Sequence, residues 1–73
     1  MSPSTTTIKV RLNGKERDVA EGHTVRSLLE SLELQPALVV VELNKEILAR
    51  DVYGDTQVRD GDNLELVHFV GGG

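Results

Sequence analysis

The residues best suited to covalent chemistry are the last three of the chain, Gly71, Gly72 and Gly73. They follow an apolar, strand-like segment, and we expect them to end in a free carboxylate. We expect a thin, flexible tail, because glycine has no Cβ and adopts backbone angles that other residues cannot. Three extended residues reach roughly 10 Å, so the tail could place one carboxylate inside a partner's active site. The alternative is a terminal segment without function, since chain ends are often disordered.

Few other residues suggest a reactive site. The chain contains no cysteine, which excludes disulfides, Cys-based metal sites and side chains that could carry a persulfide or a thioester. His23 and His68 lie far apart in the sequence and belong to no cluster of ligands, so we expect no metal site. Covalent chemistry would therefore use the carboxylate of Gly73, and no catalytic side chain is expected.

Length and charge restrict the class of protein. The chain has 73 residues and a net charge of −4, which fits one small domain and argues against nucleic-acid binding. No apolar run approaches the roughly 20 residues of a membrane span. The segment from Met1 to Thr5 lacks the basic start and apolar stretch of a signal peptide. We therefore expect a cytoplasmic protein without a membrane partner.

The first part of the chain predicts a β-hairpin after a disordered lead, residues 1–5. Apolar residues then alternate with polar ones, as in a half-buried strand, and they are Ile8, Val10 and Leu12. Asn13-Gly14 is the strongest short signal for a two-residue hairpin turn. The return strand, Lys15 to Val19, would place Val19 opposite Ile8. Its many charges suit the edge of a sheet.

A single main helix is predicted between Thr24 and Glu33. Thr24 is a suitable N-cap, and the apolar residues that follow recur at the spacing of one helix face. They are Val25, Leu28, Leu29 and Leu32. Pro36 prevents a longer helix, because proline lacks the amide hydrogen and clashes with the preceding turn.

The second half of the chain predicts further strands, which are Ala37 to Leu43, the short Ile47-Leu48 and Leu64 to Val70. The β-branched run in the first of these indicates a central strand. Turns are expected at Asn44 to Glu46 and at Asp60-Gly61-Asp62. Asp51 to Gly54 is expected to form a loop or a helical turn.

One helix can cover only one face of such a sheet. Alternation along the strands places Val40, Val67 and Phe69 on the uncovered face. Exposed apolar residues that lie together usually mark a docking surface, so we expect a partner to bind there. The alternative is that the assumed alternation is wrong by one residue and that these side chains belong to the core.

The hairpin, the single helix, the later strands and the terminal glycines together resemble the β-grasp (ubiquitin-like) fold, and more narrowly the ThiS family of sulfur carriers. The matching segments are Leu12-Asn13-Gly14, Thr24-Val25 with Leu28-Leu29, Val41 to Ile47, Asp60 to Val67, and Val70 to Gly73. The resemblance runs from about Ile8 to Gly73. It implies an α+β fold with a mixed four- to five-stranded sheet, a domain over residues 6–70 and a flexible tail over residues 71–73. The lead before the first strand departs from the family pattern.

The resemblance also implies a sulfur carrier of thiamine biosynthesis that is not itself an enzyme and binds no cofactor. A ThiF-type adenylyltransferase would use ATP to convert the Gly73 carboxylate into an acyl-adenylate. Sulfur from a cysteine desulfurase or a persulfide protein would displace AMP and leave a thiocarboxylate. A ThiG-type thiazole synthase would then take up that sulfur. Gly72 and Gly71 would thread the narrow sites of these partners.

Two alternatives of a different class remain open. The small subunit of molybdopterin synthase uses the same kind of tail within a two-protein enzyme. Those chains usually have aromatic residues in the first strand and the helix, whereas this chain has only Tyr53 and Phe69. In a ubiquitin-like protein modifier, the tail would instead be conjugated to lysines. In a plain interaction module, the tail would have no use.

Overall fold

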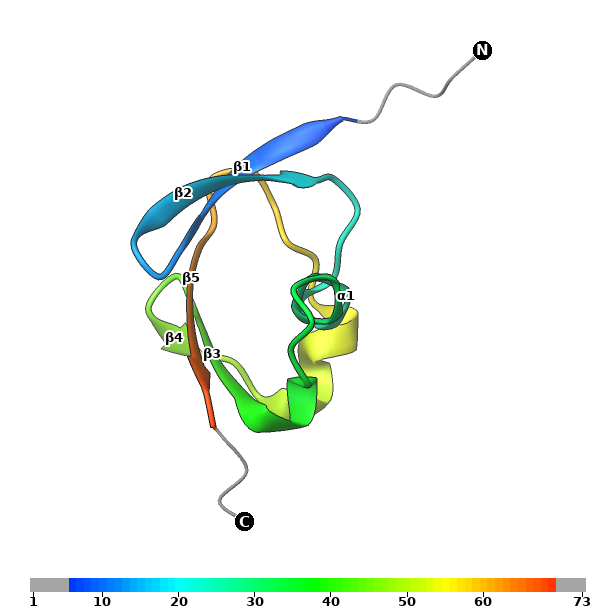
Figure 1. Ribbon diagram of the computed structural model, residues 1–73, viewed down its shortest axis with the longest axis vertical. Coiled ribbons are helices and arrows are strands. Elements are labelled where there is room, and N and C mark those ends of the chain that lie inside the picture. The colour runs from blue at the N-terminus through cyan, green and yellow to red at the C-terminus, as the bar shows by residue number, and fades with distance from the viewer. Residues whose placement is uncertain (1–5, 70–73) are drawn as a thin grey trace.

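The computed structural model describes residues 6–69 and shows five strands, one α-helix and two 3-10 helices (Figure 1). In chain order these are β1 (Thr7–Leu12), β2 (Lys15–Ala20), α1 (Val25–Ser31), η1 (Pro36–Leu38), β3 (Val39–Leu43), β4 (Glu46–Ile47), η2 (Arg50–Asp55) and β5 (Asn63–His68). The predicted lead, residues 1–5, and the predicted tail, residues 71–73, lie outside the described residues.

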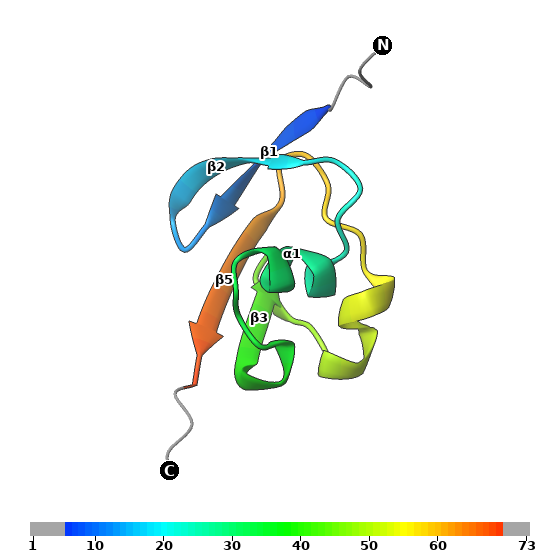
Figure 2. The ribbon, with the colours of Figure 1, turned by 45° about the vertical axis from the view of Figure 1, so that its right-hand side comes forward.

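The strands form one mixed sheet in the order β2-β1-β5-β3-β4. β5 runs parallel to β1 and antiparallel to β3, so the last strand of the chain occupies the middle of the sheet. Figures 1 and 2 show α1, η1 and η2 on the same side of this sheet. Within residues 6–69 no helix covers the other face. The predicted architecture, a mixed sheet with one main helix on one face, is confirmed.

The hairpin of β1 and β2 forms as predicted. Asn13 and Gly14 have φ angles of 51° and 83°, both positive, as the favoured two-residue hairpin turn requires. Ile8 lies opposite Val19, and β2 forms an edge of the sheet. The buried residues of β1 alternate with exposed ones, so one face of this strand enters the core.

The helix ends at Ser31 rather than at the predicted Glu33, because it is closed by a Schellman motif. Its start is as expected: the Thr24 side chain accepts a hydrogen bond from the Ser27 amide, and Ser27 completes a capping box. At its end, Glu33 has a φ of 63°, and the amides of Glu33 and Leu34 donate to the carbonyls of Glu30 and Leu29. These bonds satisfy carbonyls that the helix end would otherwise leave open, so α1 stops at Ser31.

Two later bounds also differ from the predictions. β3 begins at Val39 rather than Ala37, because Pro36 starts η1, where its fixed φ suits the first helical position. β4 is Glu46–Ile47 rather than Ile47-Leu48. The preceding turn needs two residues only, since Asn44 and Lys45 both have positive φ, 52° and 71°.

The last strand ends earlier than predicted. β5 stops at His68, although the amide of Phe69 still donates to the carbonyl of Leu38 at 2.8 Å. Val70, the predicted end, lies outside the described residues. The expected helical turn at Asp51 to Gly54 is present as part of η2.

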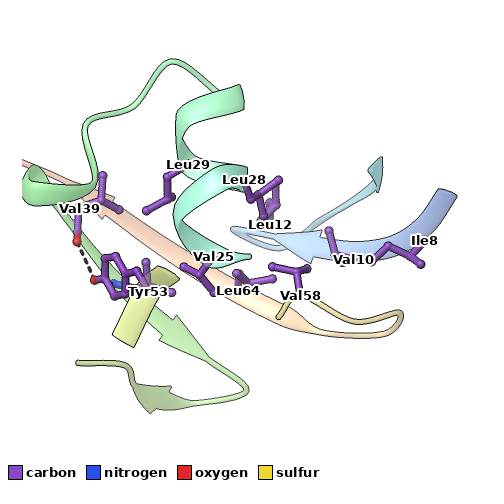
Figure 3. Close-up of a cluster of buried hydrophobic side chains, with 11 residues drawn as sticks. Ile8, Val10, Leu12, Val25, Leu28, Leu29, Val39, Tyr53, Val58 and Leu64 are labelled. Carbon is purple, nitrogen blue, oxygen red and sulfur yellow. Dashed lines mark hydrogen bonds between the residues drawn. The ribbon is translucent and has the colours of Figure 1, made fainter. Parts of the chain in front are cut away.

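The core lies between the sheet and α1 (Figure 3). Its buried residues are Ile8, Val10, Leu12, Val25, Leu28, Leu29, Val39, Val41, Tyr53, Val58 and Leu64. Tyr53 contributes polar contacts as well. Its hydroxyl donates to the carbonyl of Val39 at 2.8 Å and accepts from the amide of Val41 at 3.2 Å. β4 pairs only with the far end of β3, so the hydroxyl satisfies backbone groups that β4 does not reach.

The helices of the described part of the chain are too short and polar to cross a membrane.

Candidate functional site

The sheet face opposite α1 carries an exposed apolar patch. We call it the open-face patch, and its members are Val40, Ile47, Val67 and Phe69. Val67 and Phe69 are 56% and 55% exposed and Ile47 is 74% exposed, whereas Val40 is half-buried. The predicted placement of Val40, Val67 and Phe69 on the uncovered face is confirmed, and the alternative that they belong to the core is wrong.

The strand register brings the patch together. Val40 of β3 lies directly opposite Val67 of β5, and the amide of Phe69 donates to the carbonyl of Leu38, the residue before β3. The next pair on the same face is Glu42 and Glu65. The patch therefore lies beside two carboxylates that face each other across neighbouring strands.

Ile47 is a member of the patch that the sequence did not reveal. It lies opposite Glu42 in the pairing of β3 with β4, and this register places it on the open face. The prediction of a longer turn at Asn44 to Glu46 left the direction of the Ile47 side chain undetermined. A two-residue turn fixes that direction, and the positive φ angles at Asn44 and Lys45 show that the turn has this length.

Two asparagines hold β5, the strand that leads into the tail. The side chain of Asn13 accepts a hydrogen bond from the Leu66 amide at 2.7 Å and donates to the Leu66 carbonyl at 3.3 Å. Asn44 acts at the other end, where its amide donates to the Asn63 carbonyl at 2.7 Å and its side chain accepts from the Asn63 amide at 3.0 Å. Both asparagines occupy left-handed turn positions and continue the ladder where a neighbouring strand ends.

The predicted covalent site lies outside the described residues. Gly71, Gly72 and Gly73 follow Phe69 by a short stretch of sequence, and the structure describes the chain up to Phe69. Two members of the open-face patch, Val67 and Phe69, therefore belong to the segment that precedes the tail. A protein that binds this patch would hold the chain close to the start of the tail.

Of the four remaining candidates, His23, Asp60 and Asp62 have hydrogen-bond partners. His23 Nδ1 lies 2.8 Å from the Ser27 hydroxyl beside the helix cap, and His68 is exposed near the end of β5. Asp60 accepts from the Lys9 amide at 2.8 Å, and Asp62 accepts from the Arg59 amide at 2.8 Å, so both carboxylates stabilise the turn before β5. No group of three or more possible metal ligands occurs within residues 6–69.

Comparisons with known proteins identify the family. The model of the ThiS family matches residues 10–73 of this chain. The sulfur carrier protein ThiS of Bacillus subtilis is 42% identical over 65 residues, which cover 88% of this chain and 98% of that protein. This chain belongs to the ThiS family. The crystal structure of the thiamine biosynthesis protein ThiS from Geobacter metallireducens is similar with a TM-score of 0.77 and 42% identity, covering 90% of this chain and 100% of that one.

Membership of the ThiS family confirms the β-grasp fold, and the relatives of this name are a sulfur carrier protein and a thiamine biosynthesis protein. Another relative is much longer. A thiazole synthase of Magnetococcus marinus is 39% identical over 66 residues, which cover 90% of this chain but only 20% of that protein. The chain thus spans one fifth of the length of this relative, which contains a ThiS-like segment within a larger polypeptide.

Proposed function

We propose that this ThiS-family protein carries sulfur as a thiocarboxylate on Gly73. The observation that carries the proposal is the family match, which extends through residue 73. The composition supports it, since a chain without cysteine has no side-chain thiol on which to hold sulfur. A C-terminal carboxylate is ionised at neutral pH and is a poor electrophile, so it must be activated before sulfur can be attached.

In the proposed cycle, a carboxylate oxygen of Gly73 attacks the α-phosphorus of ATP on a ThiF-type adenylyltransferase, and pyrophosphate leaves. A persulfide sulfur, supplied by a cysteine desulfurase or another persulfide protein, attacks the acyl carbon, and AMP leaves. The product is an acyl disulfide with the donor. A thiol attacks the donor's sulfur in that disulfide, so the S–S bond breaks, a disulfide forms between thiol and donor, and the thiocarboxylate leaves. ATP is a substrate of the activating partner, and the carrier contributes the reacting carboxylate without a cofactor of its own.

A ThiG-type thiazole synthase is the proposed acceptor of the sulfur. The Magnetococcus marinus relative supports this step, because that protein is named thiazole synthase and contains a segment similar to this chain. Covalent linkage raises the effective concentration of one domain at the other.

The open-face patch is the proposed docking surface for the activating enzyme and for thiazole synthase. Val67 and Phe69 are large, exposed and apolar, and they precede the tail. Phe69→Ala should weaken partner binding by about 1–3 kcal/mol, as expected for an aromatic anchor at an interface. Because this side chain contributes little to the core, the variant should unfold at nearly the same denaturant concentration. A strongly destabilised variant whose folded molecules bind normally would contradict the docking role.

Sulfur loading is also proposed to require the glycines of the tail. Gly72 would enter both partner sites next to the reacting carbon, where any side chain would crowd the channel, and Gly71 would add reach. Gly72→Val should block loading, because a β-branched side chain is bulky and stiff. Deletion of Gly73 should abolish loading without loss of the fold, since the described strands and core are formed by residues up to His68.

Mass spectrometry of the intact chain tests the carrier chemistry. The chain is incubated with the adenylyltransferase, ATP, a persulfide donor and a thiol. Exchange of oxygen for sulfur adds about 16 Da as a covalent modification, and fragmentation should place this gain at Gly73. Loading of the variant that lacks Gly73, or a gain at any other residue, would show that the proposal is wrong.

A further inference from the structure

We propose that the thiazole synthase which docks on the open-face patch places a basic side chain over Glu42 and Glu65, with apolar side chains around it. This inference rests on the proposed carrier function and names the chemistry of the partner's surface. Three observations support it: the register of the two glutamates, their lack of a cation in the described structure, and their position next to the patch.

The two glutamates form a like-charge pair. Glu42 of β3 and Glu65 of β5 lie directly opposite each other in the antiparallel ladder. Residues in such positions have Cβ atoms about 4.5–5.5 Å apart, and like charges there destabilise the sheet. The ion pair found among residues 6–69 joins Arg26 and Glu30 of α1, so it does not relieve this repulsion.

The other charges of the same sheet face are arranged differently. Lys9 and Arg11 of β1 lie opposite Asp18 and Glu16 of β2, respectively, so opposite charges alternate on the hairpin. The β5–β3–β4 side of this face combines apolar residues with the two glutamates. Its three strands contain no lysine or arginine. A partner that is complementary to this half of the face must therefore be apolar with a positive centre.

The surroundings of Glu42 increase the effect of a partner charge. Glu42 is half-buried, and its cross-strand neighbours are Glu65 and Ile47. When an apolar partner covers the patch, water is removed from both carboxylates. A guanidinium or ammonium group between them would then convert the repulsion of the free carrier into attraction in the complex.

We infer that thiazole synthase is the partner at this surface, because a ThiS-like segment occurs within the longer thiazole synthase relative. The geometry also suits a sulfur acceptor. Glu65 and Val67 are on β5, and this strand leads toward the tail. A partner fixed there by an ionic contact and apolar contacts would hold the start of the tail at a defined distance from its own active site.

The test compares stability with affinity in the same variants. Glu65→Gln and Glu42→Gln remove the like-charge repulsion, so their unfolding midpoints should stay equal or rise. Their dissociation constants for purified thiazole synthase, measured by isothermal titration calorimetry, should each be about tenfold higher. The dependence of affinity on salt concentration should also become weaker, since one ionic contact is lost.

Charge reversal gives a sharper result. Glu65→Lys places an ammonium group opposite Glu42, which should stabilise the free carrier, yet it should weaken binding more than Glu65→Gln because it repels the partner's cation. Glu21→Gln is the matched control. It makes the same change of charge at an exposed residue of the β2–α1 loop and should leave affinity unchanged within about twofold, as usual for a surface charge outside an interface.

The outcomes separate this inference from the proposed function. If both glutamine variants and the lysine variant bind thiazole synthase as tightly as the parent chain, the ionic contact is refuted. Phe69→Ala, titrated alongside, tests the patch itself: weaker binding by that variant alone would retain the docking face and overturn only the basic contact. Sulfur loading at Gly73 is measured without thiazole synthase, so failure of the carrier chemistry would be visible independently.

Discussion

The side chain of Asn13 replaces a strand neighbour for β5, and its removal should have a measurable cost. β1 ends at Leu12, so beyond that residue the backbone of Leu66 bonds to the Asn13 amide group instead, at 2.7 Å and 3.3 Å. Asn13→Gly removes both hydrogen bonds but keeps a residue that accepts the φ of 51°. This change therefore isolates the side-chain contribution from the turn conformation.

The expected magnitude follows from the two bonds. An intramolecular hydrogen bond contributes about 0.5–1.5 kcal/mol net, and the longer bond belongs near the lower limit. The greater freedom of glycine in the unfolded chain adds about 0.5 kcal/mol or slightly more, which relief of the left-handed conformation partly offsets. We expect Asn13→Gly to lower the free energy of unfolding by about 1–2 kcal/mol.

Urea denaturation, analysed by linear extrapolation, measures this loss, and hydrogen exchange at the Leu66 amide locates it. That amide should exchange faster in Asn13→Gly. Lys45→Gly is the matched control, because Lys45 also occupies a left-handed position of a two-residue turn, with φ of 71°. Its side chain makes no hydrogen bond to the described residues, so the change should be neutral or stabilise by up to about 1 kcal/mol. Equal effects of the two substitutions would refute the reasoning.

Two further predictions concern the helix. Leu29→Ala should destabilise the fold by about 2–5 kcal/mol, since Leu29 is fully buried, and a change below about 0.5 kcal/mol in a denaturant titration would contradict its place in the core. Glu33→Gly should stabilise the fold by about 0.5–1 kcal/mol, because Glu33 has a φ of 63° at the position that glycine favours in a Schellman motif. A lower melting temperature for this variant would show that the left-handed conformation carries no strain.

Local patterns were sufficient to predict most of the elements. The alternation of Ile8, Val10 and Leu12, the Asn13-Gly14 turn and the spacing of Leu28 and Leu29 each depend on neighbouring residues, and each led to the observed structure. Alternation along the last strand likewise placed Val67 and Phe69 on the open face. Parity along a strand is a strong signal when one face is buried, because a shift by one residue would exchange the two faces.

The structure differs from the predictions where distant residues or weak sequence signals determine the conformation. The helix ends at a Schellman motif in which Glu33 takes the place usually occupied by glycine, so its sequence signature was absent. Ile47 was missed because the length of the Asn44 turn determines its side. The contact between Asn13 and Leu66 joins residues 53 positions apart, and no local pattern reveals it. These features depend on the sheet being assembled.

The central position of β5 fixes the last described segment of the chain. Hydrogen bonds from Asn13 on one side and from Asn44 on the other fix this strand, and the last described bond joins the Phe69 amide to Leu38 at 2.8 Å. From Phe69 onward, the segment Val70 to Gly73 can span at most roughly 13–14 Å. In the proposed cycle, a partner that binds the open-face patch would have its reaction centre within that distance of Phe69. In the proposed function, Val67 and Phe69 dock the partner and are joined by the covalent chain to Gly73, so binding energy at the patch would position the reacting carboxyl group.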